Sequence, residues 1–188
     1  MGKIRSIAKI FFRSSFVKEE SGVAAVEFSL VGLPFIFMIV GVIEMSMMFA
    51  SQSLLEYGTS QGARLIRTGQ VQQGGGEDAF RDAVCDAVSI TVDRGFIDCD
   101  DVQYQVITLD DFSDAADEPP PEFDEDGNLE DQGFDAGEVN DIVMIRVAYR
   151  YPILTPLMGT LLTNNSDNSR IMVSTTVLQT EPYEFSDE

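Results

Sequence analysis

The chain has 188 residues, with 32 Asp and Glu against 12 Lys and Arg, a formal net charge of −20 and no His. Without His, neither a Ser-His-Asp nor a Cys-His nucleophile arrangement is available, and histidine acid–base catalysis is excluded. The negative charge also argues against nucleic-acid binding, because that affinity rests mainly on cationic contacts to phosphates.

The first 22 residues form a basic leader. They carry a net charge of +3 and contain all three lysines of the protein, Lys3, Lys9 and Lys18. The next charge-free stretch, Phe28 to Ile43, has 16 residues. A membrane span needs about 20 apolar residues. Extension through Glu44 to Ala50 reaches that length, which predicts a transmembrane span over about 28–50.

Charge asymmetry predicts the orientation of this span. A basic flank before the span favours the cytoplasm, so the acidic remainder is expected outside it. We therefore expect a single-pass protein of the inner membrane, with a cytoplasmic N-terminus and a periplasmic head.

A short motif precedes the apolar run. Gly22 is followed by Val23-Ala24-Ala25-Val26-Glu27-Phe28, which resembles the processing site of type IV pilins and pseudopilins. The longer string from Arg13 to Phe28, together with Pro34 and the terminal Thr180-Glu181-Pro182-Tyr183, is similar to the TadE-like minor pilins of Tad (Flp) pilus systems. The resemblance is specific over residues 13–70 and loose beyond them.

This resemblance implies cleavage by a prepilin peptidase after Gly22, with Val23 as the new N-terminus and Glu27 as the fifth mature residue, followed by Phe28. It also implies several partners: the peptidase, other minor and major Tad/Flp pilins, an inner-membrane assembly platform and an assembly ATPase. Incorporation into a surface pilus, in adhesion or secretion, is the function that it implies.

Two acidic residues in or beside the apolar run need an explanation. A carboxylate inside a membrane helix costs about 2.5–3.5 kcal/mol on insertion scales and is a functional hypothesis by default. The amine freed at Val23 would lie one helical turn from Glu27 and could neutralise it. For Glu44 two alternatives remain open: it caps the outer end of the span at the headgroups, or it contacts a partner helix in an assembly.

The helix is expected to continue beyond the span, over residues 23–70. Leu54/Leu55, Gly58, Gly62 and Leu65/Ile66 recur at spacings of three and four, which indicates one apolar stripe. Gly58 and Gly62 form a G-x-x-x-G motif that permits close helix packing. The packing partner is either the protein's own head or a second subunit.

Residues 71–188 are expected to form an α+β head. Gly74-Gly75-Gly76 predicts a hinge after the long helix, and Glu77 to Val92 reads as an amphipathic helix. Alternating apolar residues predict strands around Val102–Thr108, Asn140–Tyr151 and Arg170–Thr180, with a short helix over Leu157–Leu162. The order favours a small antiparallel sheet backed by helices.

Cys85 and Cys99 both belong to the expected exterior. An even cysteine count outside the cytoplasm predicts a disulfide, and two free buried thiols are the alternative. A metal site built on two cysteines without His is disfavoured.

An acidic segment, residues 110–141, joins the first two expected strands. Its composition predicts a solvated, mobile loop. Asp124, Asp126 and Asn128 have the first three ligand spacings of a calcium loop, but Leu129 replaces the glycine expected at the sixth position. We therefore expect a plain acidic loop and no cofactor, with calcium as the weaker reading.

The sequence allows three classes of function to be compared. A TadE-like minor pilin, structural and without catalysis, is preferred. The alternative is an uncleaved membrane-anchored periplasmic binding module with an acidic, calcium-binding loop. An enzyme is not expected, because the head has no Lys or His and lacks the aromatic platform that a carboxylate-based glycosidase needs.

Overall fold

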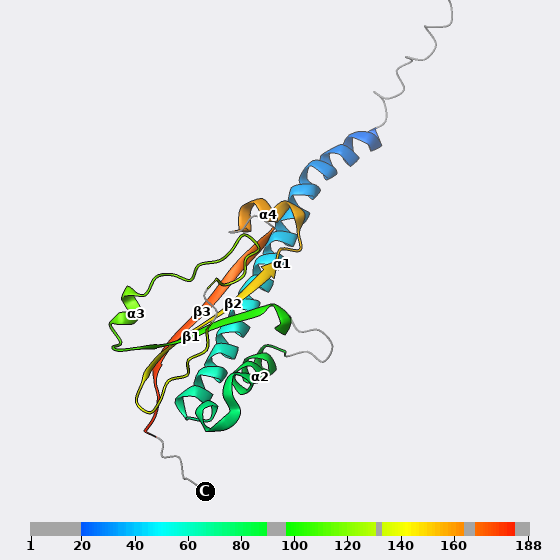
Figure 1. Cartoon of the computed structure of the whole chain (residues 1–188). Helices are drawn as coiled ribbons and strands as arrows, with labels where there is room; N and C mark the ends of the chain where they lie inside the picture. The colour runs from blue at the N-terminus through cyan, green and yellow to red at the C-terminus, as the bar shows by residue number, and fades with distance from the viewer. Residues whose placement is uncertain (1–19, 90–96, 131–132, 164–167, 183–188) are drawn as a thin grey trace, which may run out of the picture. The chain divides into compact units, whose positions relative to one another are not determined.

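The computed structural model describes residues 20–89, 97–130, 133–163 and 168–182. Most of the basic leader and the end of the expected terminal motif, Tyr183, lie outside these ranges. The chain divides into two compact units, Met1–Val42 and Ile43–Glu188, and each is described by itself. The architecture is α+β: one long apolar N-terminal helix, further helices and a three-stranded antiparallel sheet (Figure 1).

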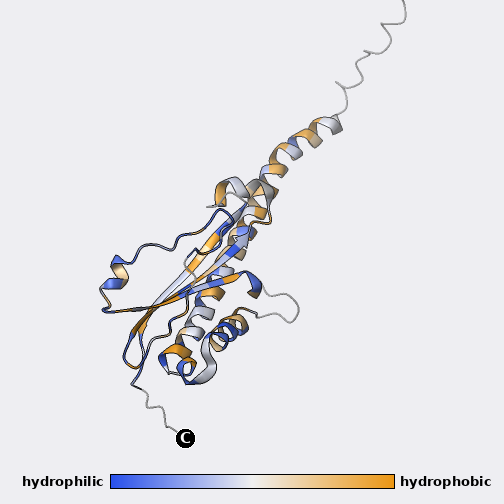
Figure 2. Cartoon of the chain, viewed as in Figure 1, coloured by the Kyte–Doolittle hydropathy of each residue, from blue (hydrophilic) through white to orange (hydrophobic). Residues whose placement is uncertain are grey.

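The long helix α1 spans Glu20–Arg67 and passes through Pro34 without interruption. By length and composition, it is the one helix in the described part of the chain that could cross a membrane. Figure 2 shows how its hydropathy is distributed. In the first unit the large apolar side chains are exposed, for example Phe28 and Leu30, at 78% and 73%. An apolar surface of this extent on a protein needs a membrane or a partner to cover it.

The second part of α1 buries a stripe of side chains in the head. Glu44, Met48, Ser51, Leu55, Thr59, Ala63 and Ile66 are all buried, at spacings of three and four. This is the helical period, and it confirms the stripe that the sequence indicates. The first buried residue of the stripe in this unit is Glu44, immediately after the charge-free run.

Helix α2, Gly76–Val88, turns back against α1 (Figure 1). A short π-helical turn, Val71–Gly75, connects the two helices. Gly74 and Gly76 have φ angles of 123° and 57°, a region that glycine adopts at little cost. The three glycines therefore form the turn into α2, whereas α1 already ends at Arg67. The expected helix over Glu77–Val92 is shorter than predicted, and residues 90–92 lie outside the described ranges.

The sheet has the order β1-β2-β3, with both pairs antiparallel. Its strands are β1 Val102–Leu109, β2 Ile142–Pro152 and β3 Ser169–Gln179. A 3₁₀ turn, Cys99–Asp101, precedes β1, and α4, Pro156–Leu162, joins β2 to β3. The alternation of apolar residues therefore predicted all three strands within a few residues.

The main core lies between one face of the sheet and the helices α1 and α2. It contains Leu55 and Ile66 of α1, Phe80 and Val84 of α2, and the odd-numbered residues of β2 from Val143 to Tyr151. Phe80, Tyr104 and Phe134 form an aromatic group with ring centroids 5.3, 5.5 and 6.2 Å apart. Phe134 comes from the acidic segment, so that segment contributes to the core.

The acidic segment also packs on the sheet, which corrects the expectation of a solvated excursion. It includes the short helix α3, Asp114–Asp117. On β2 the even-numbered Met144, Arg146 and Ala148 are buried although they lie outside the main core. The Arg146 guanidinium donates hydrogen bonds to Gln105 Oε1 at 3.1 Å and to the Pro119 carbonyl at 2.7 Å. These contacts hold the segment against the second face of the sheet.

Candidate functional site: the N-terminal helix and its head contacts

The predicted processing residues lie together near the start of α1. Gly22, Val23, Glu27 and Phe28 are all helical and exposed, and no heavy atom outside its own helix lies within 4 Å of a Cβ built on Gly22. Residues four apart on a helix have Cβ atoms about 5–6 Å apart on one face. The backbone nitrogen of Val23 and the carboxylate of Glu27 are therefore neighbours along this helix.

Glu44 behaves unlike Glu27. Its side chain is only 3% exposed, and the carboxylate accepts three hydrogen bonds from the head. Oε1 accepts from the Leu154 backbone N–H at 3.0 Å and from the Tyr151 hydroxyl at 3.3 Å, and Oε2 accepts from the Thr155 hydroxyl at 2.8 Å. A buried carboxylate is tolerated only when donors replace its lost water, and here the end of β2 and the residues between β2 and α4 supply them.

The sequence left two alternatives open for Glu44, a cap at the headgroups or a contact with a partner helix, and neither includes these intrachain contacts. In the structure the Glu44 carboxylate is held by the protein's own head. Desolvation by burial, followed by the charge of Glu44 and the hydrogen bond to it, raises the pKa of Tyr151 to about 12. Tyr151 therefore remains a neutral donor to Glu44 at ordinary pH.

Gly58 and Gly62 pack against α2 of the same chain. A Cβ on Gly58 would lie 2.8 Å from Val88 Cγ1, and one on Gly62 would lie 2.5 Å from Phe80 Cε2. Side chains at these positions would force the two helices apart. Of the two partners left open by the sequence, the structure therefore shows the protein's own head.

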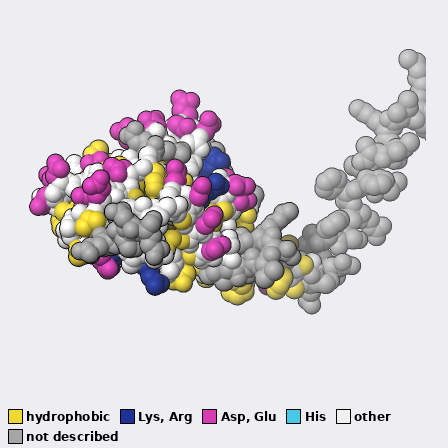
Figure 3. Space-filling model, turned by 60° about the horizontal axis from the view of Figure 1, so that its bottom comes forward, with side chains coloured by type: hydrophobic (Ala, Val, Ile, Leu, Met, Phe, Trp, Pro, Cys, Tyr) yellow, Lys and Arg dark blue, Asp and Glu magenta, His cyan; other side chains and the backbone are white. Residues whose placement is uncertain are grey.

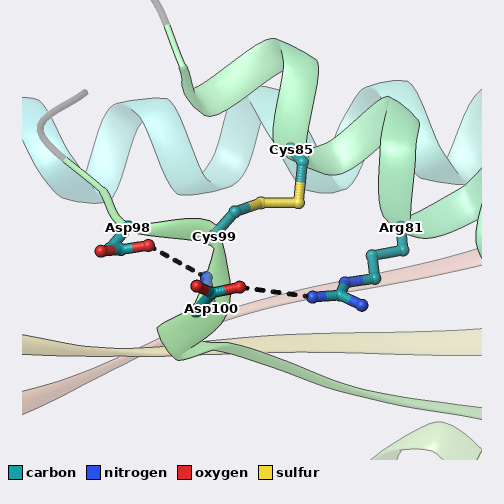
Figure 4. Close-up of a disulfide and its surroundings, with 5 residues drawn as sticks. All are labelled: Arg81, Cys85, Asp98, Cys99 and Asp100. Atoms are coloured by element: carbon teal, nitrogen blue, oxygen red, sulfur yellow. Dashed lines mark hydrogen bonds and ion pairs between the residues drawn. A yellow bond between two sulfur atoms is a disulfide. The ribbon is translucent and has the colours of Figure 1, made fainter. Parts of the chain in front are cut away.

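The predicted disulfide is confirmed. Cys85 of α2 is bonded to Cys99 of the 3₁₀ turn, with Cα atoms 5.6 Å apart (Figure 4). Beside it, Arg81 Nη2 lies 3.7 Å from Asp100 Oδ1, and the Asp100 backbone N–H donates a hydrogen bond to Oδ1 of Asp98, the residue that caps the turn. The bond ties α2 to the approach of β1.

The weak calcium motif forms a hydrogen-bonded turn. Asp124 Oδ1 accepts from the backbone N–H groups of Asp126 and Asn128 at 2.9 and 2.7 Å, and Oδ2 accepts from Asn128 Nδ2 at 3.0 Å. These hydrogen bonds, above all those from Asn128, lower the pKa of Asp124. The spacing of the three residues is thus explained by the turn itself. Among the described residues, no group of three or more Cys, Asp or Glu is arranged to hold a metal ion.

Sequence reasoning missed the head residues that hold Glu44. Tyr151, Leu154 and Thr155 lie 107, 110 and 111 residues away along the chain, and nothing local marks them as its partners. The sequence signal for these contacts was Glu44 itself. A carboxylate that is buried at the end of an apolar run requires hydrogen-bond donors from another part of the chain.

The comparison with known protein families gives a match within α1. The family model described as TadE-like protein matches residues 22–64. Searches of curated proteins and of solved structures give no match. The matched region begins at Gly22, contains Glu27 and Glu44, and ends two residues after Gly62. The resemblance of the chain to the TadE-like family is therefore confirmed over residues 22–64 of α1.

Proposed function

We propose that this protein is a minor pilin of the TadE type: a structural, non-catalytic component or initiator of a Tad (Flp) pilus, processed after Gly22. One observation carries this proposal. The exposed apolar part of α1 contains Glu27 five residues after Gly22, and both residues lie within the TadE-like match. TadE-type similarity by itself supports the coarser statement, a component associated with a Tad pilus.

The chemistry of Glu27 gives the processing step its purpose. Cleavage after Gly22 creates a charged amine on Val23, one helical turn from the carboxylate. A pair of unit charges 4 Å apart is worth about 4 kcal/mol at an effective dielectric constant of 20, before desolvation is subtracted. This is comparable with the insertion cost of about 2.5–3.5 kcal/mol for a charged residue. Neutralisation within one chain or between neighbouring chains then sets the axial register of bundled helices.

The head suits an extracytoplasmic location. It contains the disulfide, which persists in oxidising compartments, and acidic side chains are spread over the face of the head seen in Figure 3. The lysines remain in the leader, as expected for a cytoplasmic N-terminus. On this proposal the partners are the prepilin peptidase, the other pilins and the inner-membrane assembly platform.

Glu27→Gln tests the electrostatic part of the proposal. The full chain and the variant are expressed in a Tad-positive host, and sheared surface filaments are compared with the membrane fraction. We expect Glu27→Gln to reach the membrane and to be reduced in filaments at least about tenfold, the loss of about 1.4 kcal/mol of assembly free energy. Glu20→Gln, on the same helix but on the leader side of Gly22, is the matched control. Equal incorporation of the Glu27 variant and wild type would refute the pairing.

A further inference from the structure

At one end of the head, two segments of the chain contain no charged residue, although the chain as a whole is acidic. Residues 151–166, at the end of β2 and through α4, contain no Asp, Glu, Lys or Arg, and neither do residues 45–55 of α1. The whole chain carries a formal net charge of −20. The two segments lie far apart in sequence, and both lack acidic residues.

The structure brings these two segments together. The Leu154 N–H donates to Glu44 on α1. Farther along, Met45 and Phe49 of α1, Leu162 of α4, and Arg170 and Met172 of β3 line one cavity of about 290 Å³. Figure 1 shows α4 beside α1 at this end of the sheet.

Four large apolar side chains on these segments are exposed. They are Met45, Phe49, Leu154 and Leu161, at 46%, 69%, 66% and 73%, and we call them the uncharged patch. Among the described residues after Val42, the other large exposed apolar side chains are Ile43, which precedes Glu44 and Met45 in sequence, and the separate Tyr57 and Phe112. Four of the seven such side chains in the described part of the head therefore belong to the two uncharged segments.

We propose that the uncharged patch rests on the lipid surface at the outer end of the membrane-spanning part of α1. The proposal relies on the membrane anchoring in the proposed function. Chain continuity supplies the location, because the charge-free run ends at Ile43 and the patch begins at Met45. The hydrogen bonds of Glu44 to Leu154 and Thr155 then hold the end of β2 at the same level of α1.

The chemistry of the patch matches an interface of lipid headgroups and acyl chains. Amphipathic surfaces bind there through apolar side chains that enter the boundary region, aided by cations near anionic lipids. The exposed Arg170 supplies such a cation, and its Nη1 donates to the Leu162 carbonyl at 3.1 Å beside the patch. Exposed acidic side chains in these segments would be repelled by anionic headgroups, and neither segment carries one.

Tryptophan variants test this placement directly, because the protein contains no Trp. The full chain is reconstituted at one copy per nanodisc, in phosphatidylethanolamine and phosphatidylglycerol with or without bromine on the upper acyl carbons. Leu161→Trp is the test variant, and Leu154→Trp, also outside the expected span over about 28–50, gives a second position should the first variant fail to fold. Phe112→Trp, 52% exposed between Asp111 and Ser113, is the matched control. Phe35→Trp in the apolar run reports anchoring.

We expect bromine to remove about half of the emission of Leu161→Trp and of Leu154→Trp, as for a side chain at the acyl boundary, and to leave Phe112→Trp unchanged. Quenching of Phe35→Trp with no more quenching at positions 161 and 154 than at Phe112→Trp would overturn this inference and leave the anchor intact. If the emission of Leu161→Trp is blue-shifted but bromine does not quench it, the side chain is covered by protein instead of lipid, and the inference is overturned. An unquenched Phe35→Trp would refute the membrane anchor, and this inference with it.

Discussion

The Glu44 carboxylate accepts a hydrogen bond from the Thr155 hydroxyl at 2.8 Å across 111 residues of sequence. This contact joins the helix that matches the TadE-like family to a part of the chain that the match does not cover. The charge-free run of α1 is thus followed at once by an acid that is built into the head.

Replacement of Glu44 by Gln should destabilise the head. The amide keeps one oxygen acceptor but presents an NH₂ group to donors, and a buried polar group left unsatisfied costs about 1–3 kcal/mol. Denaturant unfolding of the full chain in detergent micelles, followed by circular dichroism, measures the loss. Glu56→Gln is the control, because Glu56 is exposed, and surface changes usually stay within about 0.5 kcal/mol. Equal unfolding midpoints for the two variants would contradict the role given to Glu44.

Stability should fall in alkaline solution. Burial, with Glu77 and Glu44 as the respective partners, raises the pKa of Tyr104 and of Tyr151 to about 12 from 10.0. Between these values the unfolded chain releases phenolic protons that the folded chain retains, so the free energy of unfolding decreases as pH rises. The stabilising contribution is complete below about pH 10 and is lost by about pH 12.

Unfolding midpoints measured between pH 9 and pH 12 would show this trend, because the two phenols lose their protons over this range, first in the unfolded chain and then in the folded chain. The double variant Tyr104→Phe, Tyr151→Phe has no phenol at either position, so its midpoint should depend less on pH. An unchanged slope in the double variant would count against these two tyrosines as the source.

Gly62→Ala should weaken the packing of α1 on α2. The added Cβ would lie 2.5 Å from Phe80 Cε2, and Phe80 is fully buried, so its ring has little room to move. Overpacking of this kind costs about 1–3 kcal/mol, which opposes the gain in helix propensity of about 1 kcal/mol. Ser60→Ala, on the exposed side of the same helix, is the control in thermal unfolding. A Gly62→Ala protein more stable than Ser60→Ala would disprove the close contact.

Loss of the Cys85–Cys99 disulfide should lower stability by about 3 kcal/mol, the chain-entropy value for a loop of this size. The double Cys→Ser variant and the reduced wild type should unfold at the same denaturant concentration. Arg81→Gln removes only the exposed ion pair with Asp100, which is worth about 0–1 kcal/mol. A disulfide variant no less stable than Arg81→Gln would show that the bond does not restrain the unfolded chain.

Local patterns predicted the strands and the α1 stripe because their signals are short-range. Alternation in Val143, Ile145 and Val147 reflects one face of β2 in the core, and the spacing of Gly58 and Gly62 reflects one face of α1. The disulfide followed from the cysteine count and the expected compartment. In each case a few neighbouring residues, or one elementary count, carried the information.

Long-range contacts were missed for a related reason. The composition of residues 110–141 indicated a solvated loop, yet Phe134 enters the core and Pro119 accepts from Arg146. The hydrogen-bond donors of Glu44 could not be identified from the sequence, because they lie more than a hundred residues away along the chain. When a single apolar or basic residue contacts a distant part of the chain, the contact produces no periodic pattern in the sequence.

Cleavage after Gly22 is the central claim, and intact-mass measurement of the purified protein tests it most directly. The protein is made with and without a prepilin peptidase, and Gly22→Phe is made beside the wild type. We predict that the peptidase yields a wild-type chain beginning at Val23, while Gly22→Phe stays membrane-bound at its full mass. A wild-type chain that keeps its leader in the presence of active peptidase, or that begins at another residue, would contradict the account.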